Sequence, residues 1–256
     1  MQTLYNYQEE PYVQVMRALE KDGRALLFMA TGLGKTAVSG HVARSLLNRG
    51  WRGLFLYCEN EGLGQSERRF REIVGNDISY KRFYGTTTKD WDADQAQMLF
   101  ASFQSMNSKG GKWYTIFSPD HFDFIIVDEA HHAKADTYEE VIHHFTGKKL
   151  GMTGTPDRED GRDIREIFGK EVTNRPLAQG IARGWLKQVE YHTISDGINT
   201  RKLKRILREV KSGEKRITVK QLNETIFIQK RDRIQKDIIK SYNTIKEHSV
   251  KKRTLI

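Results

Sequence analysis

A glycine-rich segment followed by lysine and threonine is the feature that most constrains what this chain can fold into. Residues 32–36 read Gly-Leu-Gly-Lys-Thr, and they stand between an apolar run at 25–29 and an amphipathic stretch that ends near Gly50. This order predicts a buried strand, a tight loop and a helix, with backbone N–H groups of the loop and helix N-terminus facing a phosphate. The strict form of this loop has glycine at position 29, where the chain has Met29. We therefore expect an α/β fold with a variant phosphate-binding loop.

A second motif, Asp-Glu-Ala-His at residues 128–131, directly follows an apolar run at 124–127. The run predicts another buried strand, and the two acids then lie at its carboxyl end, where open α/β sheets bind ligands. Carboxylates in that place can hold a metal ion and a water molecule. Together with the glycine-rich loop, the acids predict a site that binds Mg-ATP and hydrolyses it.

Apolar runs alternate with helical patterns over the first 156 residues. This alternation is typical of a parallel sheet flanked by helices on both faces. Residues 107–115, rich in serine, lysine and glycine, are expected to form an exposed loop. The predicted strands are 25–29, 53–58, 78–83, 97–102, 123–127 and 149–153, and the predicted helices are 36–49, 64–74 and 136–145.

Length and composition indicate a soluble globular protein. The chain has 256 residues, enough for one large or two small domains, and 38% of them are hydrophobic while 30% are charged. No apolar run approaches the ~20 residues of a membrane span, and the N-terminus lacks the basic and apolar regions of a signal peptide. Because Cys58 is the only cysteine, no internal disulfide can form, and we expect this residue in the core. A cytoplasmic protein without a membrane partner is expected.

The positive charge of the chain is concentrated in its last quarter. Residues 1–195 hold 25 Lys+Arg against 26 Asp+Glu, whereas residues 196–256 hold 18 against 7. Such a block is typical of a surface that contacts phosphates or of a basic interaction tail. A solvated linker whose lysines bind nothing specific is the alternative. The residues proposed to contact nucleic acid are Arg201, Lys202, Lys204 and Arg205.

The residue types of the two motifs suggest their roles. Lys35 is expected to be exposed in the absence of nucleotide and to reach the β- and γ-phosphates as a point charge. The Thr36 hydroxyl is expected to ligate Mg²⁺. Asp128 is expected to hold the Mg²⁺ through water, and Glu129 to orient or deprotonate the attacking water.

These motifs, in this order, resemble those of the DEAH-type helicases and translocases of superfamily 2, over most of residues 5–195. Tyr7-Gln8 is similar to the glutamine motif that reads adenine in that family, and an exposed polar residue is the alternative for Gln8. The resemblance implies ATP and Mg²⁺ as cofactors. It implies nucleotide contacts from Gln8, Thr31, Gly32, Leu33, Gly34, Lys35 and Thr36, metal contacts from Thr36 and Asp128, and catalysis by Lys35, Asp128 and Glu129.

Three further segments match the family. Residues 61–65 (Glu-Gly-Leu-Gly-Gln) and 101–105 (Ala-Ser-Phe-Gln-Ser) stand where the family's strand-tracking segments stand, and core or loop residues without a role are the alternative. Residues 151–156 (Gly-Met-Thr-Gly-Thr-Pro) are similar to the segment that links nucleotide state to nucleic-acid binding. The resemblance implies nucleic-acid contacts for Gln65 and Gln104, and coupling roles for His131, Thr153 and Thr155.

Within superfamily 2 the chain looks closest to the branch of restriction-enzyme motor subunits and excision-repair helicases, and residues 176–189 resemble the segment after the first motor domain of that branch. The resemblance implies a RecA-like P-loop domain over residues 1–195 and a basic, mainly helical connecting region over 196–256. A second RecA-like domain is expected to follow, because residues 251–256 look like its first strand. DNA is expected as partner ahead of RNA, with a nuclease or a restriction or repair subunit as a further partner.

The expected function is that of an ATP-binding and ATP-hydrolysing motor domain, weak without its second domain. A module that binds ATP and nucleic acid as a switch, without processive unwinding, is the alternative from another class. An RNA helicase is a further alternative. An enzyme that acts on a small molecule is disfavoured, because the sequence offers no evident use for Thr-Gly-Thr-Pro at 153–156 in such an enzyme.

Overall fold

A computed structural model describes residues 3–58, 60–84, 88–89, 95–107, 112–132, 136–155 and 163–187. These residues belong to a compact unit that spans Met1–Lys187. The expected boundary at residue 195 and the expected basic connecting region over 196–256 lie outside the described residues. No helix in the described part of the chain is long and apolar enough to cross a membrane.

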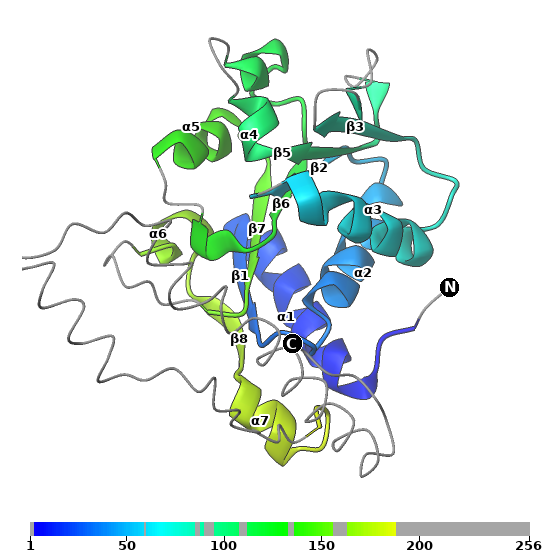
Figure 1. Cartoon of the computed structure of the whole chain (residues 1–256), viewed down its shortest axis with the longest axis vertical. Helices are drawn as coiled ribbons and strands as arrows, with labels where there is room; N and C mark the ends of the chain where they lie inside the picture. The colour runs from blue at the N-terminus through cyan, green and yellow to red at the C-terminus, as the bar shows by residue number, and fades with distance from the viewer. Residues whose placement is uncertain are drawn as a thin grey trace, which may run out of the picture. The chain divides into compact units, whose positions relative to one another are not determined.

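In the described residues, eight strands form one sheet, in the order β4-β3-β5-β2-β6-β7-β1-β8 (Figure 1). All neighbouring pairs are parallel except β3 and β4. The predicted parallel sheet of a RecA-like domain is therefore confirmed, with one short antiparallel strand at its edge. The strands are β1 Arg24–Met29, β2 Gly53–Tyr57, β3 Tyr80–Tyr84, β4 Thr88–Lys89, β5 Met98–Ser102, β6 Phe124–Val127, β7 Lys148–Thr153 and β8 Glu171–Arg175.

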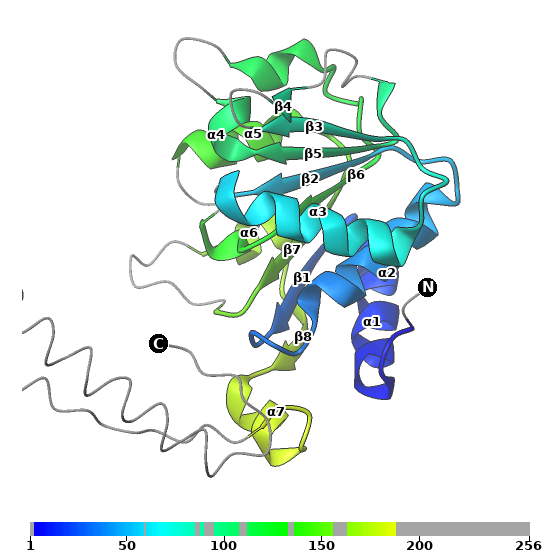
Figure 2. The same cartoon turned by 45° about the vertical axis from the view of Figure 1, so that its right-hand side comes forward.

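Helices cover both faces of the sheet (Figure 2). One face carries α1 Asn6–Asp22, α2 Lys35–Leu47 and α3 Asn60–Val74, and the other carries α4 Phe103–Met106, α5 Asp136–His144 and α6 Arg165–Phe168. The short helix α7, Leu177–Ala182, follows the edge strand β8. Two 3₁₀ turns complete the described elements, η2 at Trp113–Ile116 and η3 at Ala130–His132.

Alternation along the strands divides the core into two layers. In β2, Leu54 and Leu56 pack with the residues of α5 and α6, whereas Phe55 packs with those of α1, α2 and α3. In β6, Ile125 packs in the layer of α5 and α6, and Ile126 packs in the layer of α1, α2 and α3. Because successive side chains of a strand point to opposite faces, a strand buried on both sides needs a continuous apolar run. The apolar runs in the sequence therefore predicted β1, β2, β5 and β6 correctly.

Several parts of the fold differ from the sequence prediction. The helices α1, α4, α6 and α7 and the edge strands β4 and β8 were not predicted, and α1 has a mainly polar sequence. The expected exposed loop at 107–115 is wrong in part, because Trp113–Ile116 forms the turn η2 and Tyr114 is buried in the core. The expectation for Cys58 is confirmed, since it is buried directly after β2.

A buried carboxylate fastens α3 to the edge of the sheet. Glu67 is 1% exposed, and it accepts hydrogen bonds from Arg71 Nε at 2.9 Å, Arg82 Nε at 2.7 Å and Tyr84 Oη at 3.0 Å. Burial opposes ionisation of Glu67, but the hydrogen bonds from its partners outweigh it and lower its pKa. The side chain therefore joins α3 to β3.

Candidate nucleotide-binding site

The glycine-rich loop connects the end of β1 to the start of α2. Gly32 has φ 89°, and Gly34, the N-cap of α2, has φ 88°. Residues other than glycine rarely adopt such left-handed backbone conformations. A Cβ at Gly34 would lie 2.2 Å from Gln8 Nε2, so the loop has no room for a side chain there. The loop thus exposes backbone N–H groups at a helix N-terminus, and such groups can bind phosphate oxygens.

Lys35 is the first residue of α2, and it is 9% exposed. The expectation that it is exposed without nucleotide is therefore wrong. A Cβ at Gly154 would lie 3.4 Å from Lys35 Nζ and 3.4 Å from Thr31 Oγ1, so the ammonium group lies beside the turn that follows β7. The lysine is buried because three neighbouring strand ends, not the loop alone, surround it.

The acidic pair lies at the carboxyl end of β6, as predicted. Asp128 is 7% exposed and its Oδ1 accepts a hydrogen bond from the Glu129 backbone N–H at 2.9 Å. Burial, together with the neighbouring Glu129 carboxylate, raises the pKa of Asp128 to about 6, although Lys35 and the backbone N–H act in the opposite direction. Glu129 has φ 48°, and it is the one non-glycine residue with positive φ in the described part of the chain. A left-handed conformation at such a residue is a strain that is typical of functional sites.

A chain of short contacts joins the acids to the end of β7. His131 Nδ1 lies 3.3 Å from Glu129 Oε2 and 3.1 Å from Thr153 Oγ1. Thr153 Oγ1 in turn donates to the Thr155 carbonyl and accepts from the Thr155 N–H, both at 3.0 Å. His131, Thr153 and Thr155, the residues expected to couple nucleotide state to nucleic-acid binding, thus form a continuous chain of contacts that reaches Glu129 through His131.

Gln8 lies in the first turn of α1 and is 3% exposed, so it is not the exposed polar residue of the alternative interpretation. Its Nε2 donates to the Leu33 carbonyl at 2.9 Å, and its Oε1 accepts from the Tyr5 N–H at 3.0 Å. The rings of Tyr5 and Tyr7 stack with centroids 5.7 Å apart. Gln8 therefore ties the start of α1 to the glycine-rich loop.

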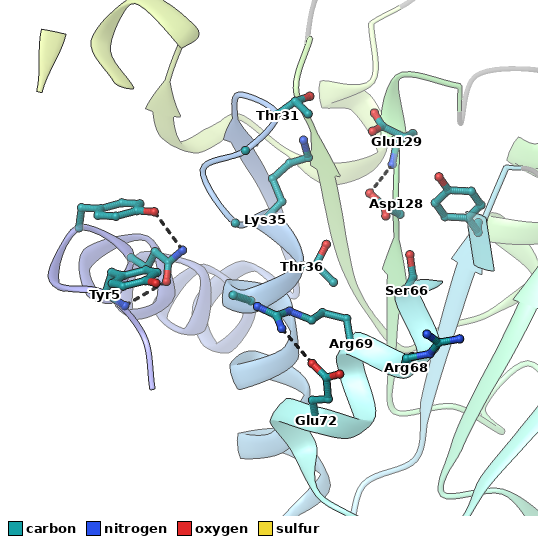
Figure 3. A pocket seen from close by; sticks show the side chains of 16 residues that line it. Tyr5, Thr31, Lys35, Thr36, Ser66, Arg68, Arg69, Glu72, Asp128 and Glu129 are labelled. Carbon is teal, nitrogen blue, oxygen red and sulfur yellow. Dashed lines mark hydrogen bonds and ion pairs between the residues drawn. The ribbon is translucent and has the colours of Figure 1, made fainter. Parts of the chain in front are cut away.

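The glycine-rich loop, the acidic pair and Gln8 all line one pocket of about 760 Å³ (Figure 3). It is lined by Lys35, Thr36, Asp128 and Glu129, as predicted, and also by side chains of α3 that the sequence motifs do not include. In Figure 3 the residues of α3 lie across the pocket from the loop. The predicted lining residues are Gln8, Thr31, Gly32, Gly34, Lys35, Thr36, Asp128 and Glu129, and the unpredicted ones include Tyr5, Tyr7, Tyr57, Ser66, Arg68, Arg69 and Glu72.

Several predicted residues do not line this pocket. Leu33 is fully buried in the core and contributes its carbonyl to Gln8 instead. Gln104 is exposed in α4, just beyond the carboxyl end of β5. Gln65 lies in α3, but its side chain is outside the description, and so are Arg201, Lys202, Lys204 and Arg205.

Residues 1–158 match the protein family described as "Type III restriction enzyme, res subunit". Over 99% of its length the chain is 22% identical to the "Putative ATP-dependent helicase IRC3" of Saccharomyces cerevisiae, of which it covers 36%. Over 64% of its length it is 28% identical to the type I restriction enzyme EcoAI endonuclease subunit of Escherichia coli, of which it covers 20%.

The fold is similar to that of a solved restriction-modification enzyme. A nuclease-deletion mutant of the type ISP restriction-modification enzyme LlaGI, solved in complex with a DNA substrate mimic, matches with a TM-score of 0.58 and 22% identity. The match covers 73% of this chain and 21% of that one. The chain spans 36% or less of the length of the curated relatives it matches.

Proposed function

The chain belongs to the family of type III restriction enzyme res subunits and is a superfamily 2 helicase-like ATPase motor domain; from this premise we propose that it binds Mg-ATP and hydrolyses it to move along DNA. One observation carries the proposal. Lys35 and Thr36 begin α2, Asp128 and Glu129 follow β6 more than 90 positions later, and all four line one pocket.

The pocket suits a nucleotide triphosphate with Mg²⁺. The glycine-rich loop supplies bare N–H groups for phosphate oxygens, and Lys35 supplies a positive charge. Thr36 and the buried carboxylate of Asp128 would hold Mg²⁺, which neutralises charge that develops on the phosphates. A carboxylate held at the bottom of a pocket with a raised pKa is a group that gains from a bound cation.

Glu129 is the residue that we assign to the attacking water. Its carboxylate is half-buried at the pocket wall, next to His131. There it can accept a proton from a water molecule and hold that water in line with the terminal phosphate. Because His131 contacts both Glu129 and Thr153, a change at the terminal phosphate would reach the turn after β7.

DNA is the nucleic acid that we propose as partner. Support comes from the restriction-modification enzyme LlaGI, which was solved in complex with a DNA substrate mimic, and from the excess of Lys and Arg at residues 196–256. Because the relatives are longer than this chain, we also propose that full activity requires a second RecA-like domain and that a nuclease or a restriction or repair subunit acts with it.

Turnover of ATP with and without duplex DNA tests this function in the protein that carries the chain. We expect DNA to stimulate turnover in the wild type and not in Lys35→Ala. Turnover that RNA stimulates and DNA does not would favour an RNA helicase. Nucleotide binding with no nucleic-acid-dependent turnover would favour a binding switch and contradict the proposal.

A further inference from the structure

The segment at residues 176–187 packs against the glycine-rich loop, although the nucleotide chemistry assigns it no role. It consists of α7 and the turn that follows, and residues 180–186 read Gly-Ile-Ala-Arg-Gly-Trp-Leu. Within the turn, the Leu186 N–H donates to the Gly180 carbonyl at 3.0 Å. This hydrogen bond folds the Leu186 side chain back toward the loop.

Leu186 packs beside the glycine-rich loop at Gly32. A Cβ at Gly32, which lines the nucleotide pocket, would lie 3.1 Å from Leu186 Cδ2. A Cβ at Gly180 would lie 2.9 Å from Leu186 Cδ1 and 3.1 Å from Leu33 Cδ2. A methyl group at Gly180 would therefore displace the side chain of Leu186 or Leu33.

Trp185 makes a second connection, on the side of α1. Its ring stacks on Tyr7 with centroids 4.8 Å apart, and the Arg175 guanidinium carbon lies 4.9 Å from its centroid. Tyr7 also lines the nucleotide pocket, and the Arg175 carbonyl accepts a hydrogen bond from the Ala30 N–H at 2.8 Å. The segment is therefore joined to the residues on both sides of the loop.

The loop depends on such neighbours for its shape. Gly32 and Gly34 are left-handed and free to adopt other conformations, so the orientation of the loop N–H groups is set by packing. Leu33, the residue between them, is held by Gln8 at its carbonyl, and Leu186 packs beside Gly32 and against the apolar cluster that contains Leu33.

We propose that Leu186 and Trp185 are positioning residues for the phosphate loop, so that nucleotide binding and the packing of the 176–187 segment depend on each other. The inference rests on the proposed nucleotide site. Coupling of this kind is reciprocal, since a segment that favours the nucleotide-binding loop must itself be favoured by nucleotide. In the sequence the segment leads into the basic residues 196–256, so it connects the nucleotide pocket with the residues proposed to contact DNA.

Nucleotide affinity measured by calorimetry tests the first half of the proposal. We expect Leu186→Ala and Gly180→Val to weaken Mg-ATP binding by about three- to thirtyfold, the range of mutations along coupled networks. Leu186→Met, which keeps the apolar contact, should bind Mg-ATP as tightly as the wild type. Leu177→Ala is the matched control, because Leu177 lies in the same helix and is 48% exposed.

Fluorescence tests the second half. A variant with Trp51→Phe, Trp91→Phe and Trp113→Phe keeps Trp185 as its only tryptophan. Adding Mg-ATP should change the emission of this variant, and adding Lys35→Ala to it should abolish the change.

The outcomes separate the two proposals. Absence of Mg-ATP binding in the wild type would remove the nucleotide site itself. If the wild type binds and Lys35→Ala does not, while Leu186→Ala and Gly180→Val bind within twofold of the wild type, the positioning role is overturned. The positioning role is also overturned if Leu186→Ala, with its fold intact, binds Mg-ATP as tightly as the wild type at 10 °C. It is likewise overturned if the emission of Trp185 does not change when Mg-ATP is added. In either case the contact would be merely structural.

Discussion

Asp128→Asn should make the nucleotide-free protein more stable. In the wild type, burial and the neighbouring Glu129 carboxylate raise the pKa of Asp128 from 3.8 to about 6. An ionised carboxylate at this position therefore destabilises the fold at neutral pH, and the shift corresponds to about 3 kcal/mol. Asparagine carries no charge, and its Oδ1 can still accept the Glu129 N–H, as the aspartate does at 2.9 Å. The free energy of unfolding should thus rise by as much as about 3 kcal/mol.

The stability advantage of Asp128→Asn should increase with pH. Between pH 3.8 and about 6 the unfolded chain has already lost the Asp128 proton while the folded chain keeps it, so wild-type stability falls as pH rises. Above about pH 6 the penalty is complete. The advantage of Asp128→Asn should therefore be about 3 kcal/mol at pH 7.5 and roughly half of that at pH 5.

Urea unfolding in EDTA, followed by circular dichroism at pH 7.5 and pH 5, measures both quantities. Asp120→Asn is the control, since Asp120 is exposed and its pKa is lowered by the Ser118 hydroxyl and a backbone N–H. It should show no gain in stability at either pH. If Asp128→Asn were no more stable than the wild type at pH 7.5, or if its advantage did not shrink at pH 5, the reasoning about a destabilised buried carboxylate would be refuted.

Glu129, Glu67 and the basic residues of the last quarter of the chain each give a further prediction. Glu129→Gln should retain Mg-ATP but lose turnover, because the residue acts on water and not on the nucleotide; normal hydrolysis by this variant would require another base. Glu67→Ala should lower the free energy of unfolding by about 2–3 kcal/mol, because it leaves Arg71 and Arg82 without their shared carboxylate; a loss below 0.5 kcal/mol in urea unfolding would contradict this. DNA affinity should fall steeply with salt, and alanine at four basic positions should flatten the slope, whereas an unchanged slope would favour a solvated linker. Those positions are Arg201, Lys202, Lys204 and Arg205.

The sequence predicted those parts of the site that depend on local pattern. Glycines 32 and 34 permit the left-handed conformations of the loop, and the apolar run before Asp128 marks a buried strand with acids at its end. In a parallel sheet the carboxyl ends of neighbouring strands share one edge, so β1, β7 and β6 bring the two motifs together without further information.

Features that depend on tertiary packing were not predictable in this way. Lys35 is buried because the turn after β7 lies beside its ammonium group, and nothing in residues 32–36 signals that contact. Glu67 is a buried acid in a polar helix, and its partners Arg82 and Tyr84 come from β3, which the helix sequence does not indicate. The packing of Leu186 beside Gly32 joins residues 154 positions apart, so no local periodicity could indicate it.

Calorimetric titration of the 256-residue chain with Mg-ATP measures whether the pocket lined by Lys35, Thr36, Asp128 and Glu129 binds the nucleotide. The wild type should bind, and Lys35→Ala should bind at least about tenfold more weakly while keeping the wild-type circular dichroism spectrum, because a charged contact to phosphate is worth more than about 1.4 kcal/mol. Equal affinities in the two proteins, or no binding by a folded wild type, would contradict the assignment of this pocket to ATP.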